Sequence, residues 1–220
     1  MRKLVIGCVA LFLLTPATSM AEDSGFEFGA RIGYAHPLGG VEGGDDSDLK
    51  DFVSGQIFPI WADIGYRINP TVFIAGYFSY GIGGPGDVVG DWCDLGNADC
   101  LAVSSRLGVQ AQFHLLPEGS ADPWLGVGTG FESTGVTFSG DDEEITFAYG
   151  GWEALLLQGG VDFKLSEYVA LGPFMGLTLS QYSSISCDGD LCGTFLDEEI
   201  DEKKWHEWLF VGIRGKFGPF

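Results

Sequence analysis

The last sixteen residues, Trp205 to Phe220, read WHEWLFVGIRGKFGPF. Side chains alternate along this stretch with a period of two, which is the pattern of a β-strand. One face is apolar and carries Leu209, Val211, Ile213 and Phe217. The other face carries Trp208, Phe210, Arg214 and Lys216, with Gly212 between them. The stretch therefore predicts a long amphipathic strand that ends the chain on aromatic residues.

The opposite end of the chain has the features of a secretory signal peptide. A basic start is followed by an apolar run from Leu4 to Leu14 and by small residues up to Ala21. This order predicts cleavage after Ala21, and the run is too short to span a bilayer as a helix. We therefore expect a cleaved segment, 1–21, and one mature domain of ordinary size, 22–220.

Seven further segments alternate in the same way as the last one. The expected strands cover about 25–34, 56–68, 71–82, 101–115, 124–138, 152–165, 169–182 and 205–217. Most have the length of a tilted membrane-spanning β-strand. No run after the signal peptide has the ~18 apolar residues of a transmembrane helix. A membrane-spanning mature chain would therefore have to be a β-barrel, because only a closed barrel otherwise satisfies its own backbone in lipid.

The connections between these strands alternate in length. Long segments at 35–55, 83–100, 139–151 and 183–204 alternate with short turns near Asn69-Pro70, 117–123 and 166–168. With eight antiparallel strands, the long segments all lie at one end and both termini at the other. The cysteine pairs and the acidic clusters fall only in the long segments. Short turns on one side and long loops on the other are typical of outer-membrane barrels.

The less apolar face of the strands separates a membrane barrel from a soluble, lipocalin-like barrel, whose strands also alternate. Glycine is frequent on this face, as at Gly126, Gly128 and Gly130 of one strand. A face in water would carry Lys, Glu and Thr, whereas glycine inside a strand suits a place where space is tight. The interior of an eight-stranded barrel is such a place. The pattern favours an all-β, antiparallel, up-and-down transmembrane barrel.

Aromatic residues flank the apolar faces as two belts, which is what lipid interfaces select. Toward the long loops these are Tyr34, Phe58, Tyr80, Trp152 and Trp205. Toward the short turns they are Phe26, Tyr66, Phe113, Trp124, Phe163 and Phe217.

In strand number, loop asymmetry and aromatic ending, the chain from residue 22 onward resembles the small eight-stranded outer-membrane barrels, such as the OmpA transmembrane domain and OmpX. The resemblance implies a monomer in the bacterial outer membrane, in contact with its lipid and lipopolysaccharide. It also implies that the barrel assembly machinery reads the C-terminal strand. Phe217 ends the alternating series and Phe220 ends the chain, so either could be the residue that the machinery reads.

Charged residues on the glycine-rich face should point into the barrel and pair there, because buried charges need partners. Four acids and six bases have this position, with a net charge of +2: Glu27, Asp63, Glu132 and Asp162, and Arg31, Arg67, Arg106, Lys164, Arg214 and Lys216. Such a network would be a packed polar plug. The same pairs could instead gate a narrow passive channel.

The formal net charge of the chain is −20, and it becomes −22 without Arg2 and Lys3. This acidity argues against a nucleic-acid partner, which would need a basic surface. Four cysteines follow the signal peptide, as is usual for disulfides in an exported protein. Proximity favours the pairs Cys93–Cys100 and Cys187–Cys192, although three pairings are formally possible.

The acidic loops could bind divalent cations, since carboxylate oxygens suit calcium. Asp188, Asp190 and Glu199 occupy positions 1, 3 and 12 of a loop with EF-hand spacing, but the context is wrong because position 5 is Cys192 and the flanks are strands. Non-specific Ca²⁺ or Mg²⁺ bridging to lipopolysaccharide is the simpler expectation, with no dedicated cofactor.

Some small barrels are enzymes that act on lipid A, and they use His and Ser side chains. His36 and His206 should lie at the loop end of two adjacent strands, but sequence spacing identifies no serine or carboxylate partner for either. We therefore expect no enzymatic activity. The expected role is structural or surface-interacting, through acidic, disulfide-stapled outer loops. A narrow passive channel is the first alternative and a lipid A-modifying enzyme the second.

Overall fold

The computed structural model describes residues 24–41, 48–52, 57–96, 98–140, 144–188 and 198–218. The predicted signal peptide, 1–21, and Phe220 lie outside the described residues. Among the described residues, no helix is long and apolar enough to cross a membrane.

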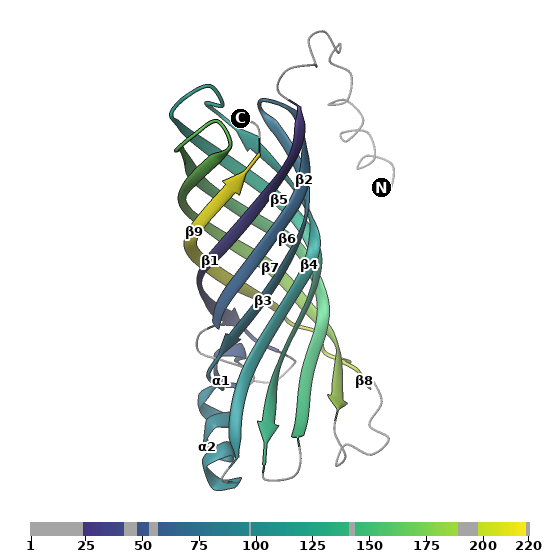
Figure 1. The fold of residues 1–220 in the computed structure, drawn as a ribbon. Helices are drawn as coiled ribbons and strands as arrows, with labels where there is room; N and C mark the ends of the chain where they lie inside the picture. The colour runs from purple at the N-terminus through teal and green to yellow at the C-terminus, as the bar shows by residue number, and fades with distance from the viewer. Residues whose placement is uncertain are drawn as a thin grey trace, which may run out of the picture.

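Eight long strands form a closed antiparallel ring (Figure 1). They are β1 Gly25–Gly39, β2 Ile57–Asn69, β3 Val72–Gly83, β4 Asp99–His114, β5 Ala121–Ser139, β6 Glu144–Lys164, β7 Val169–Asp188 and β9 Trp205–Phe217. Neighbours in sequence pair with each other, and β9 closes the ring by pairing with both β7 and β1. A two-residue strand, β8 Glu198–Glu199, pairs only with β7. The predicted eight-stranded up-and-down barrel is confirmed.

The two ends of the barrel differ as the sequence indicated. The short turns lie at the same end as the start of β1 and the close of β9 (Figure 1). At the other end lie β8 and two helices, α1 Leu49–Phe52 and α2 Asp87–Gly96 (Figure 1). We call these the turn end and the loop end. The segments with the first cysteine pair and with most of the described acidic residues are therefore gathered at one end.

All four of the predicted long loops contain some regular structure, and two of them contain more than a short helix or a strand end. The prediction of a loop over 139–151 is wrong for residues 144–151, because they belong to β6 and extend its hairpin with β5. Ile145 and Phe147 are directly opposite Phe138 and Val136, so apolar cross-strand pairs stabilise this extension of the hairpin. The predicted loop 83–100 contains α2, which sequence analysis missed. Asp141, Asp142 and Glu143 lie outside the described residues.

The outer surface of the ring is apolar and the inside is largely polar. Phe26, Ile32, Ile60, Leu107 and Phe131 each have more than half of their surface exposed on the outside. Their neighbours along the strands are buried inside the ring, as the pleat of a strand requires. An uncovered apolar belt of this extent matches lipid rather than water. One predicted belt residue is misplaced, because Trp124 is 1% exposed and lies inside with the even-numbered glycines of β5.

Candidate functional site: the polar interior and the loop end

The structure places the predicted interior charges inside the ring. Nine of the ten are buried, and Lys164 at the turn end is half-buried. Two further carboxylates, Asp122 and Glu153, are also buried there. The described interior therefore holds six acidic and six basic side chains, Lys164 included, instead of four and six. Without counting the histidines, it is electrically balanced, which lowers the cost of burying so many charges.

The central cluster is built on Arg31 and Asp63. Arg31 donates from Nε and Nη2 to the two oxygens of Asp63, at 2.9 and 2.8 Å. Gln110 donates a third hydrogen bond, to Asp63 Oδ1, at 2.6 Å, and Gln158 accepts from Arg31 Nη1. The guanidinium also lies 5.1 Å from the ring centre of Trp61, within the range of a cation–π contact. This cluster spans the barrel, because its members come from β1, β2, β4 and β6.

A second cluster lies toward the turn end. Arg67 donates to both carboxylate oxygens of Glu27, at 3.1 Å through Nη2 and more closely through Nε. Lys216 Nζ lies 3.3 Å from Glu27 Oε2 and 3.9 Å from Asp162 Oδ2, and Arg214 Nη1 lies 3.7 Å from the same Asp162 oxygen. Two cations of the last strand therefore pair with acids from β1 and β6.

The third cluster lies toward the loop end and is centred on Arg106. Its Nη2 is 3.3 Å from Glu132 Oε1, and its Nε is 3.3 Å from Glu153 Oε2. The oxygen Glu132 Oε1 also accepts from Tyr182 Oη at 2.7 Å and from Trp208 Nε1 at 2.8 Å. Glu132 and Glu153 are both almost wholly buried. Arg106 is therefore the one cation in direct contact with two buried carboxylates in this part of the described chain.

Sequence analysis missed Glu153 because a bulge reverses the alternation of β6. The register between β6 and β7 shifts between Glu153 and Leu155. The register between β5 and β6 shifts at the same level, between Gly128 and Gly130 of β5. By simple alternation, Glu153 would share the lipid face with Leu155 and Leu157, which is why it was not counted inside. A carboxylate at the loop end of an expected lipid-facing row was the available signal, because a charge facing lipid is costly.

The structure gives His206 the carboxylate neighbour that sequence spacing did not reveal. His206 Nε2 lies 3.3 Å from Glu132 Oε1, and the ring stacks on Tyr182 at a centroid distance of 4.0 Å. Ser180 is its direct cross-strand neighbour, but neither Ser180 Oγ nor His206 Nδ1 has a hydrogen-bond partner among the described residues. His206 and Ser180 are at most 1% exposed. Both side chains are therefore enclosed by the described residues around them.

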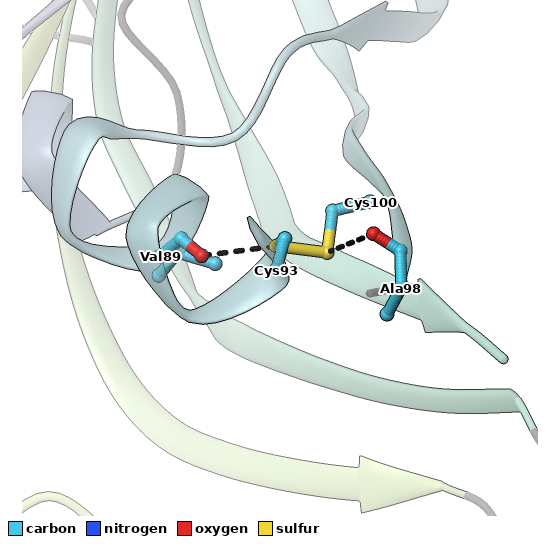
Figure 2. The surroundings of a disulfide bond; sticks show 4 residues. All are labelled: Val89, Cys93, Ala98 and Cys100. Carbon is cyan, nitrogen blue, oxygen red and sulfur yellow. Dashed lines mark hydrogen bonds between the residues drawn. A yellow bond between two sulfur atoms is a disulfide. The ribbon is translucent and has the colours of Figure 1, made fainter. Parts of the chain in front are cut away.

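Cysteine chemistry at the loop end agrees in part with the sequence. Cys93 of α2 and Cys100 of β4 form a disulfide, as Figure 2 shows, so that prediction is confirmed. Cys187 at the end of β7 is also disulfide-bonded, while Cys192 lies outside the described residues. Cys93 and Val89, one helical turn apart, are both buried against Ala102 and Val136. The first disulfide thus fastens α2 to the inner face of the strands.

Removing this disulfide should loosen α2 without unfolding the barrel. For so short a closed loop, the double variant Cys93→Ser/Cys100→Ser should lose about 2–3 kcal/mol of local stability. We expect faster protease cleavage within 84–100, while the heat-dependent shift in gel mobility stays unchanged. Reductant treatment of the wild-type protein, which also opens the disulfide of Cys187, should give the same faster cleavage within 84–100. Unchanged cleavage in both samples would contradict a fastening role.

The candidate calcium ligands are not gathered by the described structure. Asp188 is exposed at the end of β7, and Asp190 lies outside the described residues. Glu199 accepts a hydrogen bond from Lys203 Nζ at 2.8 Å, and this contact lowers the pKa of the carboxyl. The described residues contain no group of three potential metal-ligating side chains.

The closed ring, the apolar belt and the paired polar interior define the class of the protein: it has the fold of an eight-stranded β-barrel of the bacterial outer membrane. Neisserial surface protein A is a similar solved structure, with 14% identity, a TM-score of 0.50, and coverage of 88% of this chain and 98% of that one. Ail of Yersinia pestis aligns at 11% identity and a TM-score of 0.49, with coverage of 90% and 100%. OprG of Pseudomonas aeruginosa aligns at 13% identity and a TM-score of 0.44, with coverage of 91% of this chain and 99% of that one.

At such identities the likeness shows the fold alone. No protein-family model matches the sequence, and a search of curated proteins found no match.

Proposed function

We propose that this protein is a sealed outer-membrane barrel with a structural and surface-contacting role, rather than a channel or an enzyme. The observation that carries the proposal is the succession of three charged clusters along the barrel interior. Each cluster joins side chains from strands on different sides of the ring, as in the contact of Arg31 from β1 with Gln158 from β6. A barrel of eight strands has an interior that side chains alone can fill.

Aromatic rings close the spaces between these clusters. Trp61 packs on Phe174 and on Phe210, with ring centroids 5.5 and 4.8 Å apart. Arg214 lies 4.3 Å from the ring centre of Trp124, which joins the turn-end cluster to the middle of the barrel. Ion passage would require these rings to move and at least one buried ion pair to break, which is costly.

Planar-bilayer recording tests the seal. The wild-type protein, reconstituted and checked by its gel mobility shift, should give no discrete openings. The double variant Arg31→Ala/Trp61→Ala removes the centre of the plug and should give openings where the wild type gives none. Discrete openings of the wild type would contradict the proposal and favour a narrow passive channel.

Contact with lipopolysaccharide through divalent cations is the surface role that we propose for the loop end. The described acids there include Asp87, Asp91 and Asp94 of α2, all exposed. Carboxylates in this density would hold Ca²⁺ or Mg²⁺ between the loops and lipid phosphates. Isothermal titration of the folded protein with calcium, in the presence and absence of lipopolysaccharide, tests this. If the heat of calcium binding is the same with and without lipopolysaccharide, the proposed bridging between the loops and lipid phosphates is contradicted.

A further inference from the structure

An apolar cavity of about 500 Å³ lies at the loop end, above the polar interior. Helix α2 supplies Val89 and Trp92 to its wall, and the extended strands supply Val136, Phe138, Phe147 and Ile185. None of the described residues that line it is charged. Its volume lies within the range of small-molecule sites in proteins, which are mostly apolar and largely pre-formed.

The cavity faces the inside of the barrel rather than the lipid. Phe147 is directly opposite Val136, and Tyr149 directly opposite Thr134, so each pair shares one face of the sheet. Thr134 is buried and donates to Glu132 of the third cluster, which fixes that face as the inner one. Lipid chains that coat the outer belt therefore do not explain this apolar surface.

The floor of the cavity is joined to the polar interior by stacked aromatic rings. Tyr149 lines the cavity and packs on Tyr182 at a centroid distance of 5.7 Å. Tyr182 in turn stacks on His206 and donates to Glu132. The cavity is thus closed below by side chains held in the third cluster. Its mouth is marked by Phe147 and Trp92, which remain 42% and 56% exposed.

We propose that this cavity binds one small apolar molecule that is neutral or positively charged. An apolar cavity holds water poorly, so an apolar guest gains free energy by leaving water for it. The size excludes a helical partner, since a single helical turn with its side chains already fills about 500 Å³. This binding goes beyond the proposed function and does not depend on whether the barrel is sealed.

The charge preference follows from the other face of α2. Asp87, Asp91 and Asp94 are spaced four and three residues apart, so they share one exposed face of the helix that also supplies Val89 and Trp92. These carboxylates place a negative potential beside the mouth, and no described residue that lines the cavity carries a positive charge to offset it. An anionic ligand is therefore disfavoured both on approach and by desolvation.

Two fluorescent probes that differ by one sulfonate test both parts of the proposal. N-phenyl-1-naphthylamine is neutral, and 8-anilino-1-naphthalenesulfonate is the same skeleton with a negative charge. Each is titrated into the protein in lipid nanodiscs, and the signal of empty nanodiscs is subtracted. We expect saturable binding of the neutral probe and about tenfold weaker binding of the anion, with the difference shrinking as salt screens the acids. No saturable signal for the neutral probe, or equal affinity for both, would overturn the proposal.

Two matched variants locate the site. Phe147→Asp puts a carboxylate into the cavity and should weaken the binding of the neutral probe by about tenfold or more. Leu95→Asp adds the same charge at a residue of α2 that is 87% exposed and outside the cavity wall, and it should change binding by less than about twofold. If Phe147→Asp fails the gel mobility check, Ile185→Asp is the second cavity variant. Equal losses in cavity and control variants would place the probe elsewhere.

Discussion

Arg106→Met should lower the free energy of unfolding by about 3–5 kcal/mol, because it leaves two buried carboxylates without their cation. Glu132 and Glu153 are each 3.3 Å from the guanidinium and are almost wholly buried. Methionine fills much of the same volume, so the loss of charge dominates over the loss of packing. Urea titration of the protein folded in lipid vesicles, followed by tryptophan fluorescence, measures the change.

The triple variant Arg106→Met/Glu132→Gln/Glu153→Gln should recover most of that loss. A glutamine at 132 keeps an oxygen for Tyr182 and Trp208, and one at 153 keeps an oxygen for Tyr77. Replacing a whole buried ionic group by neutral residues is often close to neutral for stability. A triple variant as unstable as Arg106→Met would show that packing, not charge balance, sets the cost.

An exposed pair provides the reference for these measurements. Lys203→Ala removes the contact with Glu199 at the loop end, where both groups are open to solvent to different degrees. Such exposed pairs contribute little, because water and salt screen them. The unfolding midpoint of Lys203→Ala should therefore match that of the wild type. A marked shift would mean that the loop end contributes more to barrel stability than its contacts indicate.

The architecture could be predicted from the sequence because a membrane barrel repeats one signal many times. Every strand alternates, so an error at one residue does not change the count of strands or their direction. The apolar face of Phe26, Phe28 and Ile32 in β1, for example, is exposed as expected. The same repetition distinguishes the loop end from the turn end in the sequence alone.

The prediction of the interior was limited by errors in which residues of a strand face inward. Trp124 is an aromatic residue near the turn end, so its type suggested the lipid interface, while its even position placed it inside with Gly126. Glu153 was absent from the predicted interior charges because a bulge interrupts the alternation of β6. Bulges depend on the pairing of two strands, and a single sequence does not show which residues face one another.

Partners across the barrel could not be predicted at all. Arg31 and Gln158 are 127 residues apart in sequence, and their contact exists only because the ring closes. The cavity at the loop end has the same origin. Its apolar residues lie in two segments, 83–100 and 139–151, that looked like loops, and only folding brings α2 over the extended hairpin.

Gly212→Leu should prevent the ring from closing properly and is expected to abolish, or strongly reduce, the heat-shifted folded band. Gly212 of β9 is directly opposite Gly33 of β1, at the seam where the last strand meets the first. A Cβ atom at Gly212 would lie 2.3 Å from the carbonyl oxygen of Ile32 and 2.8 Å from the ring of Phe174. Overpacking alone typically costs about 1–3 kcal/mol, and here a backbone atom would have to move as well.

Val211→Leu is the matched control, because it enlarges the adjacent side chain of the same strand on the lipid side. Val211 is 45% exposed, so a larger side chain there meets lipid and not the seam. The control should fold as well as the wild type. If both variants lose the folded band, the C-terminal strand is sensitive to any change, as a recognition signal for assembly would be. If only Gly212→Leu loses it, folding requires space between β1 and β9. The residues that β9 can carry are then limited by the close packing of the two strands at the seam.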